Sequence, residues 1–452
     1  MKEKVTAIFD IGKTNKKLIL FDYDLEIVSE TEEKFNQITD DDGFECEDIE
    51  KIERWIMDSI KNLIQSGKYD LTSVNFSTYG ATLAYLNAEG KRLTPIYNYL
   101  KPIDEKIPER IYRKNGGQDE FCRRTASPAL GMLNSGIQAL WLKTTKPEVF
   151  SNVRHILHFP QYLSYLLTGK IYSEHTSIGC HTALWDFDNM NYHPWLEKEG
   201  ITLPDPAPVD TVNEVVIDGK KLVVGIGIHD SSSSLAPYFG SDWKFLLLST
   251  GTWCINMNPF NSEKLTTSEL DNDCLCYIGI NCQPVKSSRL FLGNMHETAV
   301  AILNEHFKVK PDAYTEVKPD EAIEKRLTEK FGDKNFFLKP GPLSREFMEK
   351  IDLFDFGTFD EAYHQLMREL GRLTIEAVNL IIPDNDESEN IYITGGFSRN
   401  LLFPRIISKA YPSKKVYTSI VNNSTALGAA LVMTGKINPE KEVELNLGLT
   451  MC

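Results

Sequence analysis

Two aspartates stand at the ends of short apolar runs, each beside residues that suit a phosphate. Asp10 follows the run 5–9 and precedes the turn Gly12-Lys13-Thr14-Asn15, while Asp230 follows the run 223–228 and precedes four serines. A carboxylate at the end of a buried strand keeps its charge by meeting a metal ion or a transferable proton, and adjoining glycines let backbone N–H groups reach phosphate oxygens. The pair therefore predicts ATP-dependent phosphoryl transfer.

Each aspartate has a functional and a structural interpretation. Asp10 would act through water on Mg²⁺ while the turn amides and nearby lysines meet phosphate, or the segment is a plain hairpin whose polar turn faces water. Asp230 would be the general base that accepts the proton of an attacking sugar hydroxyl. The alternative is that it caps a helix beginning near the serines.

Two later segments offer further ligand groups. Ser249-Thr250-Gly251-Thr252 supplies hydroxyl and amide donors in one turn, which suits terminal phosphates, although an ordinary hairpin turn has the same composition. The run 390–394 predicts a strand, Gly395-Gly396 permits the close approach of a ligand, and Ser398-Arg399-Asn400 is expected to start a helix. This arrangement can hold an adenosine, but glycine pairs after strands also serve packing.

The length and the order of elements favour two lobes with a ligand cleft between them. At 452 residues the chain exceeds one ordinary core, and a hairpin over 5–21 has a counterpart over 244–257. Glycines at 225 and 227 suit a hinge, so we place the lobes at 1–225 and 226–452. Strands alternate with amphipathic helices, which predicts α/β layers. The expected helices cover 49–65, 134–143, 160–167 and 363–380.

Composition and charge exclude several kinds of partner. The formal net charge of −15 argues against nucleic acid, and no apolar run approaches the roughly 18 residues that span a bilayer. The eight cysteines form no C-x-x-C array and no signal peptide precedes the first strand, so a reducing, cytoplasmic compartment is expected. The run Asp40-Asp41-Asp42 lacks EF-hand spacing and is expected to be a solvated loop. The oligomeric state stays open, a homodimer included.

Four segments together resemble the motifs of the FGGY carbohydrate kinases, two-domain members of the actin/Hsp70/hexokinase-like ATPase fold. The segment 157–169, which ends in Leu-Thr-Gly, and the acidic stretch 43–55 agree with this resemblance. It spans Phe9 to about Gly428 and implies two duplicated actin-like/RNase H-like α/β lobes, with ATP and sugar in the interdomain cleft. The four segments are Asp10-Ile11-Gly12-Lys13-Thr14, Gly227-Ile228-His229-Asp230, Ser249-Thr250-Gly251-Thr252-Trp253 and Thr394-Gly395-Gly396-Phe397-Ser398-Arg399-Asn400.

The resemblance implies a role for each matched residue. Asp230 is implied as the catalytic base, and Asp10 and Asp230 as the residues at Mg²⁺, with ATP as the phosphoryl donor. The sugar-side residues implied by position are Thr78, Tyr79, His229 and Asp230. The residues implied to bind ATP are Gly12, Lys13, Thr14, Asn15, Thr250, Gly251, Thr252, Gly395, Gly396 and Asn400.

Within this family the segments 134–141, 227–234 and 249–253 are similar to the rhamnulokinase branch, which phosphorylates the 1-hydroxyl of a 6-deoxyketose such as L-rhamnulose. Two segments depart from the family. Ser77-Thr78-Tyr79-Gly80 stands where Gln-Ser-His-Gly is usual, and Tyr97-Asn98-Tyr99-Leu100 replaces Trp-x-Asp-x-Arg. A site that has lost a carboxylate and a guanidinium selects different sugar hydroxyls, so L-fuculose, xylulose and other polyols stay open as substrates.

Two further alternatives concern the aromatic residues and the class of protein. The aromatic-rich stretch 79–99 either lines the sugar pocket or packs in the core. From another class, an actin- or Hsp70-like ATP switch without enzymatic activity would share the fold. Such a switch needs phosphate turns but no carboxylate facing a sugar hydroxyl, and Asp230 therefore favours the kinase.

Overall fold

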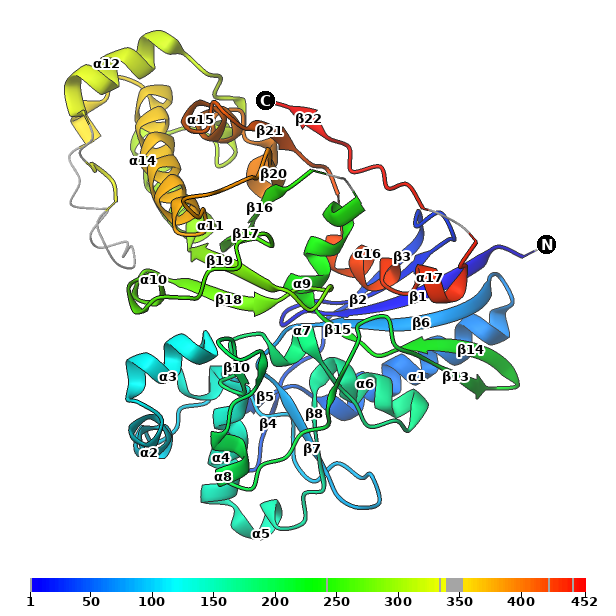
Figure 1. The fold of residues 1–452 in the computed structure, drawn as a ribbon. Helices are drawn as coiled ribbons and strands as arrows, with labels where there is room; N and C mark the ends of the chain where they lie inside the picture. The colour runs from blue at the N-terminus through cyan, green and yellow to red at the C-terminus, as the bar shows by residue number, and fades with distance from the viewer. Residues whose placement is uncertain (1, 241–242, 333–334, 339–352, 422, 441–442) are drawn as a thin grey trace.

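Two seven-stranded sheets form the centres of two lobes (Figure 1). The structure is a computed structural model that describes residues 2–240, 243–332, 335–338, 353–421, 423–440 and 443–452. The N-terminal sheet has the order β13-β14-β6-β1-β2-β3, with β15 also paired to β6. Its strands are β1 (Lys4–Ile11), β2 (Lys16–Phe21), β3 (Ile27–Glu33), β6 (Asp70–Thr78), β13 (Val212–Ile217), β14 (Lys220–Gly225) and β15 (Ile228–His229).

The C-terminal sheet has the order β18-β19-β17-β16-β20-β21-β22 and repeats the plan of the first. In each sheet a central strand pairs antiparallel with the next strand in sequence and parallel with a later one: β1 with β2 and β6, β16 with β17 and β20. Both predicted hairpins and their duplication are thus confirmed. The strands are β16 (Phe245–Thr250), β17 (Cys254–Asn258), β18 (Cys274–Ile278), β19 (Pro284–Leu290), β20 (Asn390–Gly395), β21 (Lys415–Thr418) and β22 (Thr450–Met451).

Alternation of apolar residues along β1 gives the N-terminal sheet two buried faces. Val5 and Phe9 point to the face covered by α1 (Ile49–Ser66) and α6 (Phe159–Thr168), while Ile8 points to the opposite face. There it meets α16 (Ser424–Leu431), which comes from the far end of the chain and contacts both β1 and β6. A sheet buried on both faces has no solvent-facing strand at its centre, and β1 is accordingly apolar almost throughout.

The C-terminal sheet is covered by α11 (Leu292–Phe307) and α14 (Phe359–Asn379) on one face. Helix α14 begins after Thr358, whose side chain accepts a hydrogen bond from the backbone N–H of Glu361. Helices α12 (Glu321–Phe331) and α15 (Phe403–Ala410) both pack against α14, and α15 also contacts β21. All four predicted helices are present, the second as α4 (Ser135–Thr145).

The rest of the first lobe is a set of short elements below the N-terminal sheet in Figure 1. Its core is aromatic and aliphatic, and Tyr85, Tyr97 and Trp195 are fully buried in it. These elements are β4 (Ile38–Thr39), β5 (Glu45–Cys46), β7 (Leu83–Leu86), α2 (Lys106–Lys114), α3 (Gln118–Thr125), α5 (Pro147–Phe150), β8 (His155–His158), β9 (Ser173–Glu174), α7 (His175–Ile178), β10 (Trp185–Asp186), β11 (Asn191–Tyr192), α8 (Trp195–Lys198) and β12 (Pro206–Ala207).

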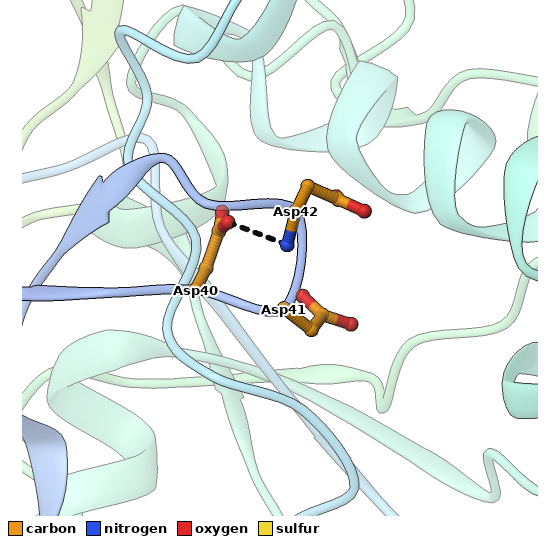
Figure 2. Close-up of side chains that lie close together, drawn as sticks. All are labelled: Asp40, Asp41 and Asp42. Atoms are coloured by element: carbon orange, nitrogen blue, oxygen red, sulfur yellow. Dashed lines mark hydrogen bonds between the residues drawn. The ribbon is translucent and has the colours of Figure 1, made fainter.

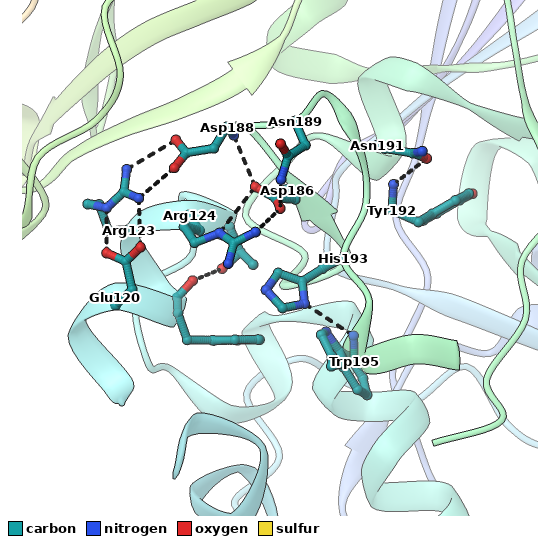
Figure 3. A network of polar contacts seen from close by, with 12 residues as sticks. Glu120, Arg123, Arg124, Asp186, Asp188, Asn189, Asn191, Tyr192, His193 and Trp195 are labelled. Atoms are coloured by element: carbon teal, nitrogen blue, oxygen red, sulfur yellow. Dashed lines mark hydrogen bonds and ion pairs between the residues drawn. The ribbon is translucent and has the colours of Figure 1, made fainter. Parts of the chain in front are cut away.

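A polar network lies among these elements (Figure 3), and one of its residues also bonds to the C-terminal half. Arg123 of α3 pairs with Glu120 and Asp188, and its Nη1 also donates to the Leu265 carbonyl at 3.2 Å. Lys264 lies 3.7 Å from the same Asp188 carboxylate. The segment 264–265 leads into α10 (Thr267–Asp271), which contacts α3. The Arg123 guanidinium therefore bridges the two lobes.

The two lobes also exchange elements near the middle of the chain. Strand β15 lies beyond residue 225 yet pairs with β6 of the first sheet, and α9 (Asp230–Leu235) then leads to the second sheet. Helix α16 of the C-terminal half returns to the first sheet, where the Ala429 carbonyl accepts a hydrogen bond from the Asn75 amide at 2.8 Å. The proposed division at 225/226 stays a prediction. Within the described residues, no helix combines the length and apolarity that a membrane crossing requires.

Helices α9 and α16 approach so closely that one glycine decides their spacing. A Cβ at Gly428 would stand 1.9 Å from the Ser233 carbonyl oxygen, so Gly428→Ala must push the helices apart. We expect this change to lower the free energy of unfolding by about 1–3 kcal/mol, the usual cost of overpacking a core. Urea denaturation followed by circular dichroism measures it. The control is Gly435→Ala in α17 (Thr434–Ile437), where a Cβ meets no atom within 4 Å; equal effects of the two changes would contradict the packing argument.

Candidate active site

Asp10 and Asp230 lie together at the carboxyl edge of the N-terminal sheet. Strand β6 pairs parallel with β1 on one side and with β15 on the other, and Ser77 is the register partner of both Asp10 and Ile228. Asp230 follows β15 directly and is the first residue of α9. Because the carboxyl ends of parallel strands open onto one edge, both side chains reach the same region.

The electrostatics of the two carboxylates agree with this proximity. Burial raises the pKa of Asp10 to about 6, and the charge of Asp230 adds to the rise, while the Thr425 hydroxyl opposes it by donating to Oδ2 at 2.6 Å. Burial also raises the pKa of Asp230 to about 6, against the N–H and hydroxyl of Ser231. The Asp230 side chain keeps 32% of its surface exposed, so this carboxylate is accessible from outside the protein interior.

The turn that carries Asp230 is held by buried neighbours. The His229 ring lies 3.1 Å from Asp230 Oδ1 and 3.0 Å from Cys180 Sγ through its Nε2 atom. Burial lowers the pKa of His229 to about 4, so the imidazole beside the carboxylate is neutral and does not form an ion pair with it. The Ser231 N–H donates to the same Oδ1 atom at 2.6 Å. Asp230 is therefore oriented from both sides.

Two glycines allow the surrounding backbones to approach this turn. Gly227 has φ +86°, and a Cβ there would stand 2.6 Å from the Pro160 carbonyl oxygen. A Cβ at Gly80 would come within 3.0 Å of Cys180 Sγ and 3.2 Å of the His229 ring. The spacing between the end of β6, helix α6 and the Asp230 turn thus depends on these glycines.

The predicted phosphate turn is a tight hairpin in which the Gly12 N–H donates to the Asn15 carbonyl at 2.9 Å. Thr14 is exposed at its tip. The Asn15 side-chain oxygen is buried and has no hydrogen-bond partner among the described residues. Lys16 is fully buried and pairs with Glu47 at 3.0 Å, so its ammonium group belongs to the interior of the lobe.

Lys13 departs from the direction that its predicted role suggests. Its Nζ atom lies over the rings of Tyr79 and Tyr99, 5.4 and 5.1 Å from their centroids, and 3.6 Å from Glu47 Oε1. Burial lowers the pKa of the ammonium group. The Lys13 side chain therefore lies beside Tyr79, a residue predicted to contact the sugar, and not at the tip of the phosphate turn.

The aromatic stretch 79–99 divides between the two interpretations left open by the sequence. Tyr79, Tyr85 and Tyr97 are buried core residues, and Tyr99 is half-buried; the rings of Tyr79 and Tyr99 also lie beside the Lys13 ammonium group. The Thr78 hydroxyl is fully buried and donates to the Tyr79 carbonyl at 2.9 Å. Tyr99 lies close enough to Asp230 for that charge to contribute to raising the phenol pKa, after burial. Tyr99, from the segment predicted to replace the family's Trp-x-Asp-x-Arg pattern, therefore lies near Asp230.

The Asp40-Asp41-Asp42 run corrects one expectation (Figure 2). Asp41 and Asp42 are exposed as expected, whereas Asp40 is buried and accepts hydrogen bonds from Asp42 N and Phe44 N, which fold the run into a turn. Lys101 Nζ lies 2.6 Å from Asp40 and 2.5 Å from Asp42, and Lys146 pairs with Asp41 and Asp42. Two ammonium groups therefore compensate this acidic run.

A cavity of about 500 Å³ in the C-terminal lobe gathers the predicted ATP residues Gly251, Thr252, Gly396 and Asn400. The two glycine turns stand opposite the start of α11, where a Cβ at Gly293 would be 2.3 Å from the Gly251 carbonyl oxygen. The remaining lining residues are Gly293, His296, Glu297, Tyr314, Thr315, Phe397 and Arg399. Aromatic walls with a few polar groups are typical of sites for a planar base.

Thr250 and Gly395 shape the cavity without facing it. Thr250 Oγ1 donates to the Thr394 carbonyl and accepts from Phe397 N at 3.0 Å, which fixes the turn after β20. Gly395 has φ +83°, and a Cβ there would stand 1.8 Å from the Thr250 carbonyl oxygen. The strand β20 was predicted correctly.

The helix expected to start at Ser398 begins later. Residues Gly396–Arg399 form a 3-10 turn, and α15 starts at Phe403. The reason is Asn400, whose Oδ1 accepts from Leu402 N and Phe403 N, both at 2.9 Å, and so caps the helix start. Its amide group donates to Tyr363 OH at 2.8 Å.

A second, smaller cavity of about 120 Å³ lies between the lobes beside Asp230. His229 and Ser231 line it from the first lobe, and Tyr277 and Arg289 from the second. The turn that carries Asp230 therefore borders a hollow to which both lobes contribute. Tyr314 and Tyr277 could not be predicted as cavity residues, because a lone aromatic residue carries no motif and only the folded chain brings it to a cavity.

Comparisons with known proteins agree with this architecture. Residues 5–202 match the N-terminal domain of the FGGY family of carbohydrate kinases, and residues 242–331 match the carbohydrate kinase FGGY C-terminal domain. The rhamnulokinase of Yersinia pestis is 27% identical over 256 residues, 53% of this chain and 50% of that protein. The rhamnulokinase of Mannheimia succiniciproducens is 24% identical over 287 residues, 59% and 57% of the two chains. The chain thus matches about half the length of these curated relatives.

Solved structures share the fold over the whole chain. A carbohydrate kinase from Novosphingobium aromaticivorans superposes with a TM-score of 0.79 at 23% identity, covering 100% of this chain and 94% of that one. Xylulose kinase from Lactobacillus acidophilus gives 0.75 at 17% identity, covering 97% and 90%. The two duplicated actin-like/RNase H-like lobes expected from the sequence are confirmed. On its sequence motifs, its fold and both domain matches, the chain belongs to the FGGY family of carbohydrate kinases.

Proposed function

We propose that this protein is an ATP-dependent carbohydrate kinase that phosphorylates a terminal hydroxyl of a ketose, with L-rhamnulose or a similar deoxyketose as the first candidate. The observation that carries the proposal is the placement of Asp10 and Asp230 at one sheet edge, with Asp230 partly exposed. A base with a pKa near 6 is ionised at neutral pH yet still accepts a proton well. The similarity to rhamnulokinases supports the choice of sugar.

In this proposal the two lobes hold the two substrates. ATP enters from the 500 Å³ cavity, with its phosphates toward the turns at 12–15 and 251–252. The sugar lies against Tyr79 and His229, and Asp230 takes the proton of the attacking hydroxyl. Closure of the lobes excludes water, which would otherwise compete with the sugar as the nucleophile.

The residues present also fit a magnesium ion. Asp10 and Asp230 are hard oxygen donors, and the charge of one raises the pKa of the other, so a dication would relieve their repulsion. Mg²⁺ characteristically combines one or two carboxylates with substrate phosphates. Asp10 and Asp230 would hold the ion, which when bound neutralises charge on the phosphates.

A second group of acceptors, L-fuculose, xylulose and other polyols, is favoured by one observation. The segment that contains Tyr99 replaces the family's Trp-x-Asp-x-Arg pattern, and Lys13 Nζ lies 5.1 Å from the centroid of the Tyr99 ring. An aromatic ring with one ammonium group bonds a different set of hydroxyls. An ATP switch without enzymatic activity remains the alternative from another class. The partly exposed Asp230 carboxylate distinguishes the kinase from it.

We expect Asp230→Asn to lower kcat by about 10²-fold or more, because an amide cannot accept the hydroxyl proton. ATP binding, followed by isothermal titration calorimetry, should stay within about twofold. The matched control is Asp210→Asn, whose carboxylate pairs with Lys436 at the surface. Wild-type turnover in Asp230→Asn would remove this residue from the mechanism.

The substrate itself is tested by coupled ADP release across L-rhamnulose, L-fuculose, D- and L-xylulose, D- and L-ribulose, erythrulose and glycerol. We expect the highest kcat/KM with L-rhamnulose or another deoxyketose, because the tyrosine rings of the pocket favour an apolar carbon over a hydroxyl. Equal weak rates on all acceptors would place the substrate elsewhere. ATP hydrolysis that no sugar accelerates would favour the switch.

A further inference from the structure

A buried carboxylate outside the proposed chemistry gathers four hydrogen-bond donors near the Asp230 turn. Glu174, at the end of β9, is fully buried. Its Oε1 accepts from Thr176 N at 2.8 Å, and its Oε2 accepts from Thr176 Oγ1, Ser177 N and Ser177 Oγ at 2.6, 3.1 and 3.3 Å. Burial raises the pKa of Glu174 to about 7 although these donors oppose it. All four of these hydrogen bonds have a Glu174 oxygen as the acceptor, so both carboxylate oxygens must act as acceptors.

Thr176 connects this carboxylate to the Asp230 turn. Its hydroxyl has one proton, which goes to Glu174 Oε2, and its oxygen then accepts the backbone N–H of His229 at 3.1 Å. His229 immediately precedes Asp230 and contacts its carboxylate. Since the hydroxyl can rotate, Glu174 decides that a lone pair, and not the proton, faces the His229 N–H.

The helix that carries Thr176 is itself held between the lobes. Helix α7 contacts β15 of the first sheet and β18 of the second. A Cβ at Gly179, just after α7, would stand 2.3 Å from an Ile278 side-chain carbon, and the Ile278 carbonyl accepts from Ser232 Oγ at 2.9 Å. The Glu174–Thr176 pair thus sits where movement of either lobe would reach the Asp230 turn.

We propose that Thr176, with its hydroxyl oriented by Glu174, is a positioning residue that fixes the backbone of the Asp230 turn for phosphoryl transfer. The inference rests on the proposed function, in which Asp230 is the base. It assigns no contact with sugar or ATP to either residue. The hydrogen bonds act on kcat through the direction of Asp230, because a base displaced by a fraction of an ångström loses its alignment with the hydroxyl proton.

The test compares Thr176→Val, Thr176→Ser and Glu174→Gln with a matched control, Thr125→Val. Thr125 is also buried and its hydroxyl donates to a backbone carbonyl, that of Phe121, within α3. We expect Thr176→Val to lower kcat about tenfold with the KM for ATP unchanged, and Thr176→Ser, which keeps the hydroxyl, to restore kcat to within about threefold of wild type. Glu174→Gln puts an amide N–H against the Thr176 donors and should lower kcat as Thr176→Val does.

Several results would overturn the inference. The role would be merely structural if Thr176→Val kept wild-type kcat, or if the valine and serine variants lost kcat equally. It would also be merely structural if Thr176→Val lost no more kcat than Thr125→Val at the same melting temperature. If Thr176→Val does not fold, the comparison of Thr176→Ser with Glu174→Gln still tests the inference. At equal melting temperatures, Glu174→Gln must have the lower kcat of the two. Asp230→Asn separates the two proposals: its full activity removes the proposed base, whereas its inactivity beside an active Thr176→Val removes only the positioning role.

Discussion

The structure depends on two like charges that one sheet edge brings together. Asp10 and Asp230 end strands on either side of β6, and each ionises less readily because it is buried, Asp10 also because its neighbour is charged. Such a pair is costly unless a cation or a proton is shared there. The chain keeps it by close backbone packing at Gly227 and by the Thr425 hydroxyl, which reaches Asp10 from the other end of the sequence. The residues that hold this sheet edge together therefore also hold the two carboxylates proposed for the chemistry.

In the second half of the molecule, the corresponding feature is a cavity and not a pair of carboxylates. Thr250 uses its hydroxyl to fix the turn after β20, and the Gly395 backbone leaves no room for a side chain beside it. The Asn400 amide N–H donates to Tyr363 OH, and its side-chain oxygen accepts from Leu402 N at the start of α15. Asn400 lines the cavity, and Thr250 fixes a turn beside it. The halves meet through α9 and α16, which pack against each other.

The sequence predicted the duplicated hairpins, four long helices and the glycine turns, because those features are local and follow from apolar periodicity and turn residues. It could not predict that β15 adds Asp230 to the first sheet, since pairing between strands 150 residues apart leaves no local signal. The direction of Lys13 and the compensation of Asp40 by Lys101 were likewise hidden, because both depend on partners supplied by the folded lobe. The start of α15 moved because Asn400 acts as its cap.

We propose that Asp10 and Asp230 share one electrostatic environment. NMR titration of isotope-labelled aspartate carboxyl carbons, with the Asp10 signal assigned from Asp10→Asn, measures the ionisation of Asp10. We expect an Asp10 midpoint of about 6 in the wild type, falling in Asp230→Asn because the neighbouring charge no longer opposes ionisation. An Asp10 midpoint that is the same in both proteins, or one already near the ordinary value of about 4 in the wild type, would contradict it.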